Sequence, residues 1–250
     1  MSIDIKEKAA EVLEEGFCIL PQHLPRELMQ ECNEAFAPIL AEYASEITEN
    51  PNRGPMRHYI PLPMRPPFYD KCIFDDDTIH AILTELLTED IAMAQFASDT
   101  PQNGSVYQDV HADMAPLFPD APALVHPPFL IAVNFPFVDV PPEKGPFEVA
   151  RRSHLLPKEE ALQKIEVGEI PLEPLLMQAG DVLIRNPACL HRGSPNRTDE
   201  PRPVAVIGCH RSWLNRYQRV SDSPMQRSVW DQLSERERKV LGSFSDTVRL

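Results

Sequence analysis

The first ninety residues carry apolar positions at helical spacing. In Ile5–Leu13 these positions recur every three or four residues, and the pattern stops at Gly16, which predicts one helix. Two similar patterns follow Pro25 and the acidic run 75–77, and both positions are typical of a helix start. We therefore expect this part of the chain to be mainly helical.

From about residue 91 the pattern changes to short apolar runs that are separated by turn residues. The runs cover residues 129–137, 146–150, 181–185 and 202–210. Short runs at this spacing are typical of a β-sandwich or a β-barrel rather than of alternating strands and helices.

The C-terminal part returns to a helical pattern. Ser223–Pro224 offers an N-cap followed by a first-turn proline. Ser234 and Glu237 have the spacing of a capping box, and Gly242 offers a stop. We expect helices after both of these start signals.

The order of these patterns predicts one mainly β domain with framing helices over residues 1–250. Its parts are a mainly helical N-terminal part (1–90), a β core (91–213) and a C-terminal helical part (214–250). The chain shows no internal repeat, low-complexity tract or flexible linker that would favour a division into separate domains.

Proline is frequent, at 27 of 250 residues against 9 glycines. Residues 51–67 contain six prolines, with Arg53, Arg57 and Arg65 between them. Because proline blocks helix interiors and removes backbone donors, we expect a long ordered loop there and no regular element. One hypothesis is that this loop covers an active-site mouth and touches substrate; the alternative is a surface strap without ligand contacts.

Composition narrows the class of protein. Lysine and arginine total 24 against 38 acidic residues, a net charge of −14, and no basic run is present, so we expect no nucleic-acid partner. The chain has no signal-peptide pattern and no apolar stretch long enough for a membrane span. Its five cysteines are scattered and odd in number, which favours free thiols. We expect a soluble, cytoplasmic protein, either a monomer or a homodimer.

The β region contains candidate metal ligands. In His111-Ala-Asp113 the two side chains are two residues apart, so on an extended segment they project to the same side. His191 lies in a second segment eighty residues later. Two imidazoles and one carboxylate are the facial triad of non-haem Fe(II) oxygenases, which leaves coordination positions open for ligands.

At these residues the sequence resembles the phytanoyl-CoA dioxygenase-like family of Fe(II)/2-oxoglutarate-dependent oxygenases. The motifs that carry the resemblance are Gln108-x-x-His111-x-Asp113, Gly145-Pro146, Ser153-His154, Gly180-Asp181, His191-x-Gly193-x-x-Asn196 and Arg202. The resemblance is close over residues 91–213 and implies a double-stranded β-helix, a jelly-roll or cupin-like core that holds iron at its open mouth.

The resemblance also implies roles for single residues. His111, Asp113 and His191 would bind Fe(II), and Arg202 would hold the distal carboxylate of the cosubstrate 2-oxoglutarate. Arginine suits that task because its planar guanidinium binds a carboxylate through two parallel hydrogen bonds. The remaining cosubstrate-side candidates are Gln108 as a further donor and Asn196 and Thr198 as residues that orient the loop.

The implied reaction consumes O2 and 2-oxoglutarate, releases succinate and CO2, and oxidises a C–H bond of a small molecule, with hydroxylation as the expected outcome. Halogenating relatives lack the carboxylate ligand, so Asp113 favours oxygen insertion over halogenation. Secondary metabolites are among the substrates that the resemblance implies.

Four further residues are candidates for substrate contact. Arg151 and Arg152 stand where many relatives have Pro-Gly, and their alternative role is to balance an acidic surface. Arg57 belongs to the proline-rich segment, and Trp213 follows the last core strand, where it would line the pocket or plug the barrel end. We expect the substrate to carry an anionic or polar group.

Two other functions remain open from the sequence. A cupin-like metalloenzyme, an isomerase or a dioxygenase, would use the triad without 2-oxoglutarate and would have no use for Arg202. A non-catalytic binding module would keep the barrel but would have no reason to bring three ligands together. Succinate release and metal content separate these alternatives from the leading prediction.

Overall fold

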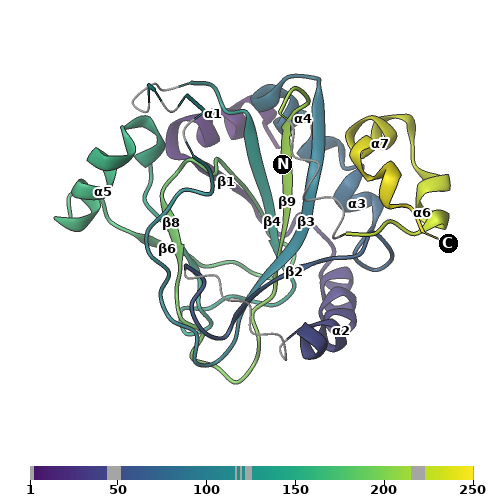
Figure 1. Ribbon diagram of the computed structural model, residues 1–250, viewed down its shortest axis with the longest axis horizontal. Coiled ribbons are helices and arrows are strands. Elements are labelled where there is room, and N and C mark those ends of the chain that lie inside the picture. Colours follow the sequence, from purple (N-terminus) through teal and green to yellow (C-terminus); the bar gives the residue numbers. More distant parts are fainter. Residues whose placement is uncertain are drawn as a thin grey trace.

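Two antiparallel β-sheets that face each other form the centre of the computed structural model (Figure 1). The structure describes residues 3–43, 52–115, 117–118, 120–121, 126–214 and 223–249. The strands are β1 (Phe17–Leu20), β2 (Arg57–Pro61), β3 (Ile91–Pro101), β4 (Leu130–Pro136), β5 (Phe147–Val149), β6 (Glu173–Leu175), β7 (Val182–Arg185), β8 (His191–Gly193) and β9 (Val204–Arg211).

The larger sheet has the strand order β1-β7-β4-β9-β3-β2, and the smaller has the order β6-β5-β8. Neighbours in the larger sheet are far apart in the chain: Cys18 lies opposite Ile184, and Val133 lies opposite both Ile184 and Ile207. This arrangement is a double-stranded β-helix, so the predicted fold class is confirmed.

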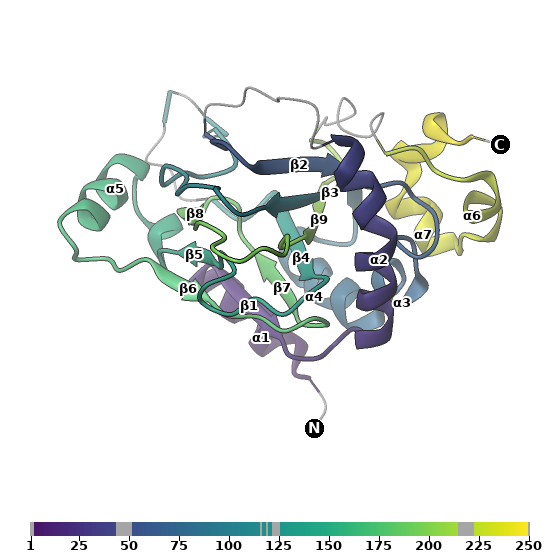
Figure 2. The ribbon, with the colours of Figure 1, turned by 90° about the horizontal axis from the view of Figure 1, so that it is seen from below.

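Most of the helices pack on the outer face of the larger sheet, whereas the helix formed by Lys158–Glu166 lies on the side of the smaller sheet (Figure 2). The helices are α1 (Ile5–Glu15), α2 (Arg26–Tyr43), α3 (Lys71–Phe74), α4 (Asp77–Leu87), α5 (Lys158–Glu166), α6 (Arg227–Gln232) and α7 (Glu235–Val240), with 3-10 turns η1 (Ser153–Leu155) and η3 (Gly242–Thr247). Helix α1 ends as predicted at Gly16, whose φ of 96° is left-handed. None of the helices in the described part of the chain is long and apolar enough to cross a membrane.

Strand β4 shows why the core strands appear as continuous apolar runs in the sequence. Its residues Ile131, Val133 and Phe135 pack against the helical layer, whereas Ala132 and Asn134 line a cavity between the two sheets. Because successive side chains of a strand point to opposite faces, both faces of this strand are buried. The helices pack on one face of the strand, and the side chains of the other face line the cavity between the sheets.

The proline-rich segment differs from its prediction. Arg57–Pro61 forms strand β2, which pairs with β3 from Arg57 opposite Pro101 to Pro61 opposite Ala97. Proline is tolerated because β2 is an edge strand, which makes ladder bonds on one side only. The expectation of a loop without regular structure is therefore wrong for these residues, and residue 51 lies outside the described part.

The two predicted C-terminal helix starts have different outcomes. Ser234 and Glu237 form the capping box at the start of α7, as predicted. The start predicted at Ser223–Pro224 is wrong, because the Pro224 carbonyl accepts a hydrogen bond from the Met64 N–H at 3.0 Å. Helix α6 begins only at Arg227, after this segment has paired with the chain near the larger sheet.

Candidate active site

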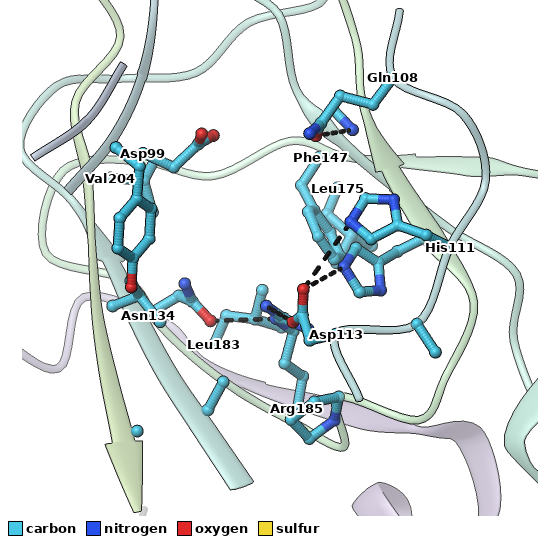
Figure 3. A pocket seen from close by; sticks show the side chains of 18 of the residues that line it. Asp99, Gln108, His111, Asp113, Asn134, Phe147, Leu175, Leu183, Arg185 and Val204 are labelled. Atoms are coloured by element: carbon cyan, nitrogen blue, oxygen red, sulfur yellow. Dashed lines mark hydrogen bonds and ion pairs between the residues drawn. The ribbon is translucent and has the colours of Figure 1, made fainter. Parts of the chain in front are cut away.

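A partly open cavity of about 360 Å³ lies between the two sheets (Figure 3). Its apolar wall comes from inward-facing positions of the core strands, such as Leu183 of β7 and Val206 of β9. Polar side chains gather in two places, around His111 on one side and around Asp99 on the other. The cavity therefore combines an apolar interior with two charged ends.

His111, Asp113 and His191 meet at one of these ends. Their ligand atoms all lie within 4.8 Å of one another. The Oδ1 atom of Asp113 is 3.7 Å from Nε2 of His111 and 3.4 Å from Nε2 of His191 (Figure 3). The structure thus brings together the three residues that the sequence proposes as metal ligands.

Backbone pairing positions the three groups. His191 opens β8, and His111 pairs with it through two N–H···O=C hydrogen bonds, each 2.9 Å long. The N–H of Asp113 donates to the carbonyl of Pro187 at 3.0 Å. Segments eighty residues apart in the sequence are therefore joined directly at the site.

Each imidazole also has a fixed ring orientation. Nδ1 of His111 is 2.8 Å from the carbonyl oxygen of Asp109, and Nδ1 of His191 is 2.8 Å from that of Cys189. A carbonyl accepts but cannot donate, so Nδ1 of each neutral ring carries the proton and Nε2 keeps a lone pair. Burial and the adjacent His191 lower the pKa of His111, which favours the neutral form. Both rings are thus prepared to bind a metal through Nε2.

Arg185 holds the third candidate ligand. Its Nη2 donates to Oδ2 of Asp113 at 2.7 Å, and its Nε donates to Oδ1 of Asn134 at 3.2 Å. Although burial raises the pKa of Asp113, the charges of Arg185 and His191 hold this pKa well below its usual value. Asp113 is therefore a carboxylate, with one oxygen bound to Arg185 and the other directed toward the imidazoles.

The donor set fits a divalent transition metal. Two imidazoles and a carboxylate converge on one point, and a partly open cavity lies beside them. This combination is the 2-His-1-carboxylate set of non-haem iron sites, in which the remaining positions serve the reactants.

Arg202 lies at the other charged end. It precedes β9 by two residues, rather than opening that strand as expected, and its N–H donates to the carbonyl of Pro101 at 3.1 Å. Burial lowers its pKa to about 10, against the opposing effect of Asp99, so the guanidinium stays charged at neutral pH. Its Nη2 lies 3.5 Å from Oδ2 of Asp99.

Gln108 also lines the cavity. Its side-chain Oε1 accepts from the N–H of Gly193 at 3.0 Å, and its Nε2 donates to the carbonyl of Asn52 at 3.1 Å. Asn196 and Thr198 lie outside the lining and shape the loop before Arg202. The amide of Asn196 donates to the carbonyl of Pro101 at 3.1 Å and accepts from the Thr198 N–H at 2.9 Å.

The structure does not place Arg57 in the cavity wall. Its side chain is fully buried behind Asp99, to which Nη1 donates at 2.9 Å. Its Nη2 donates to the carbonyl of Ser194 at 2.8 Å. The prediction of direct substrate contact by Arg57 is therefore not supported by its position.

Three other predicted substrate residues also lie away from the cavity lining. Arg151 binds Glu173 at 2.7 Å, and Arg152 binds Glu15 at 3.2 Å. Trp213 is 59% exposed and lies outside the cavity lining. The arginines fit their alternative role as partners of acidic surface residues.

Several polar residues of the cavity were not predicted from the sequence. Asn134 and Arg185 are the single polar positions of β4 and β7, Asp99 lies in the more polar end of β3, and all three point inward (Figure 3). A polar residue in such a strand was the available signal, because burial of an unpaired polar group is costly and calls for a partner in the core. Tyr59 and Gln95 line the wall beside them and contact each other.

Comparisons with known proteins agree with this geometry. The family model of phytanoyl-CoA dioxygenase (PhyH) matches residues 12–204. The structure of the epimerase SnoN from nogalamycin biosynthesis superposes with a TM-score of 0.61 at 21% identity, covering 82% of this chain and 81% of that one. HygX from Streptomyces hygroscopicus, solved with nickel, 2-oxoglutarate and hygromycin B, gives a TM-score of 0.60 at 18% identity, with 84% and 88% covered.

Fold and donor set together define a double-stranded β-helix enzyme of the non-haem iron, 2-oxoglutarate-dependent class. Because the family model spans most of the chain, the protein belongs to the phytanoyl-CoA dioxygenase family. The predicted family and enzyme class are thereby confirmed.

Proposed function

We propose that this protein is an Fe(II)- and 2-oxoglutarate-dependent oxygenase that hydroxylates a small molecule. The observation that carries the proposal is the convergence of His111, Asp113 and His191 in a cavity whose lining also includes Arg202. A metal enzyme without a dicarboxylate cosubstrate would not need a buried cation in that wall. Bound iron would supply the activation of O2, which protein side chains cannot perform themselves.

The residues divide the work between binding and orientation. His111 and His191 would offer Nε2, and Asp113 would offer Oδ1. Arg202 would bind the distal carboxylate of 2-oxoglutarate, since a guanidinium pairs with a carboxylate in a bidentate manner. Gln108 is held by Gly193 and would border the cosubstrate.

The cavity limits the class of substrate. A cavity of about 360 Å³ would hold 2-oxoglutarate beside a small substrate, or beside the reacting part of a medium-sized one. We propose that its polar or anionic group faces Arg53 and Tyr59, where the guanidinium lies 4.4 Å from the ring centroid. Its reacting C–H bond would lie beside the triad, next to the apolar wall of the cavity. The neighbours include an epimerase and a carbocyclase, and product analysis would distinguish hydroxylation from these two outcomes.

Anaerobic titration tests the proposal first. Addition of Fe(II) and then 2-oxoglutarate should produce a visible charge-transfer band, and aerobic turnover should release succinate. His111→Ala or Asp113→Ala should abolish both signals and weaken Ni(II) binding in calorimetry by at least 100-fold. A band and succinate release that survive either substitution would refute the ligand assignment.

A second pair of variants tests the cosubstrate site. Arg202→Ala should raise the 2-oxoglutarate Kd by roughly 100-fold, because a charge-assisted bidentate contact is lost. Arg152→Ala is the matched control, since it removes an exposed guanidinium outside the cavity lining and should leave this Kd unchanged. Catalysis without succinate release would instead favour the cupin-like alternative.

A further inference from the structure

Asp99 forms a carboxylate bridge between two buried arginines at the Arg202 end of the cavity. Its Oδ2 lies 2.9 Å from Nη1 of Arg57 and 3.5 Å from Nη2 of Arg202. The two guanidinium groups are nearly inaccessible, with side-chain exposures of 0% and 3%, whereas the Asp99 side chain is 33% exposed and lines the cavity. A protein carboxylate therefore already stands beside the cation proposed to bind a cosubstrate carboxylate.

The two contacts of Asp99 are unequal, because Arg57 is held in place by its other neighbours. Arg57 donates to the carbonyl of Ser194 at 2.8 Å, and a Cβ on Gly193 would lie only 2.5 Å from its Cζ. The guanidinium thus lies flat against a glycine, in a space that a larger residue would fill. Held there, it keeps Asp99 at short distance and leaves Arg202 with the longer contact.

As a result, Arg202 has side-chain N–H groups that Asp99 does not occupy. A guanidinium has five N–H donors, and the side-chain contact described for Arg202 uses only one of them. Its Nε is buried without a partner among the described residues. The three groups together carry a net charge of +1, two arginines against Asp99, so one further carboxylate would neutralise the cluster. A dianionic cosubstrate supplies that carboxylate at its distal end.

We infer that Asp99 sets the affinity for the cosubstrate by competing with its distal carboxylate for Arg202, and that Arg57 restrains this competition by drawing Asp99 away. The inference rests on the proposed function, because it takes Arg202 as the cosubstrate cation. Asp99 is an affinity-determining residue of the cavity wall, and Arg57 is a positioning residue that acts through it. This role explains why Arg57 is buried behind the wall rather than exposed in it.

The two single substitutions should shift the affinity in opposite directions. Asp99→Asn removes the competing charge and should lower the Kd of 2-oxoglutarate by about tenfold. Arg57→Met releases Asp99 to pair closely with Arg202 and should raise that Kd by about tenfold. In the double variant no competing carboxylate remains, so adding Arg57→Met to Asp99→Asn should change the Kd by less than threefold.

Calorimetry on the Ni(II)-loaded protein measures these constants without turnover. 2-Oxopentanoate is the control ligand, because it has the five-carbon chain and keto acid of 2-oxoglutarate without the distal carboxylate. Its Kd should stay within threefold across the variants. Circular dichroism melts establish that each variant is folded, and if Asp99→Asn does not fold, the shift caused by Arg57→Met decides.

The outcomes separate this inference from the proposed function. If the wild-type protein does not bind 2-oxoglutarate, or Arg202→Ala binds it normally, the proposed function fails. If the wild type binds and Arg202 matters, but Asp99→Asn binds no tighter, Asp99 does not compete and the inference alone fails. Equal weakening by Asp99→Asn and Arg57→Met would also overturn it, because a purely structural ion pair predicts that result.

Discussion

Gly193 offers a test of how the Arg57 cluster is built. In Gly193→Ala the new Cβ would lie 2.5 Å from Cζ of Arg57, whereas carbon atoms in contact are normally about 3.5–4.0 Å apart. The guanidinium must therefore move by about 1 Å. Its hydrogen bonds to Asp99 at 2.9 Å and to Ser194 at 2.8 Å would then be too long.

The size of the effect follows from these two bonds. A hydrogen bond to a charged group contributes about 1.5–3 kcal/mol. Because Asp99 is one-third exposed, we take the lower end of this range for each bond, which gives about 3 kcal/mol in total. For a chain of this length, that loss lowers the Tm by about 6–12 °C.

Thermal and urea unfolding of the metal-free protein measure this loss. Gly242→Ala is the matched control, because a Cβ there would meet no atom of the described residues within 4 Å. The decisive measurement is Gly193→Ala in an Arg57→Ala background, where the clash no longer exists and the cost should fall below about 0.5 kcal/mol. An unchanged cost in that background would refute the proposed clash.

Three further predictions concern the site and the frame around it. Arg185→Met removes the donor that orients Asp113 and should weaken Ni(II) binding by about 10–100-fold in calorimetry; unchanged binding would contradict this role. Burial lowers the pKa of His80 and His154 in the folded protein. Below pH ~6.5 the unfolded chain therefore binds more protons than the folded chain, so the free energy of unfolding should decrease as the pH is lowered. The urea midpoint should be lower at pH 5.5 than at pH 7.5, and equal midpoints would contradict this prediction. Ser234→Ala removes the capping box and should lower the free energy of unfolding by about 1 kcal/mol, which a thermal melt would record as a lower Tm.

The sequence allowed the fold class to be predicted because burial on both faces leaves a strong local pattern. Ile131 and Val133 pack on the helices while Ala132 faces the cavity, so all three positions are apolar and the strand is plain in the sequence. Strand β2 was missed for the opposite reason. Local proline content argued against a strand, and only the neighbouring β3 at the sheet edge makes it stable.

The metal-site candidates were accessible from the sequence because a short motif brings two of them together. His111 and Asp113 are separated by one residue, and an extended backbone places both side chains on one side. Asp99 and Arg185 have no such motif. Their roles depend on partners that are distant in the chain, such as Arg57 for Asp99, and only the folded sheets bring these groups into contact.

The reciprocal backbone pairing of His111 and His191 has a consequence for handling the enzyme. These two ligands are held by protein hydrogen bonds, 2.9 Å in each direction, and not by the metal alone. Loss of the ion should therefore leave the ligand geometry standing, so that stripped protein can be reloaded by simple addition of Fe(II). The rate of metal exchange at this centre should then depend on binding and release of the ion, and the metal-free protein should not have to refold before it becomes active.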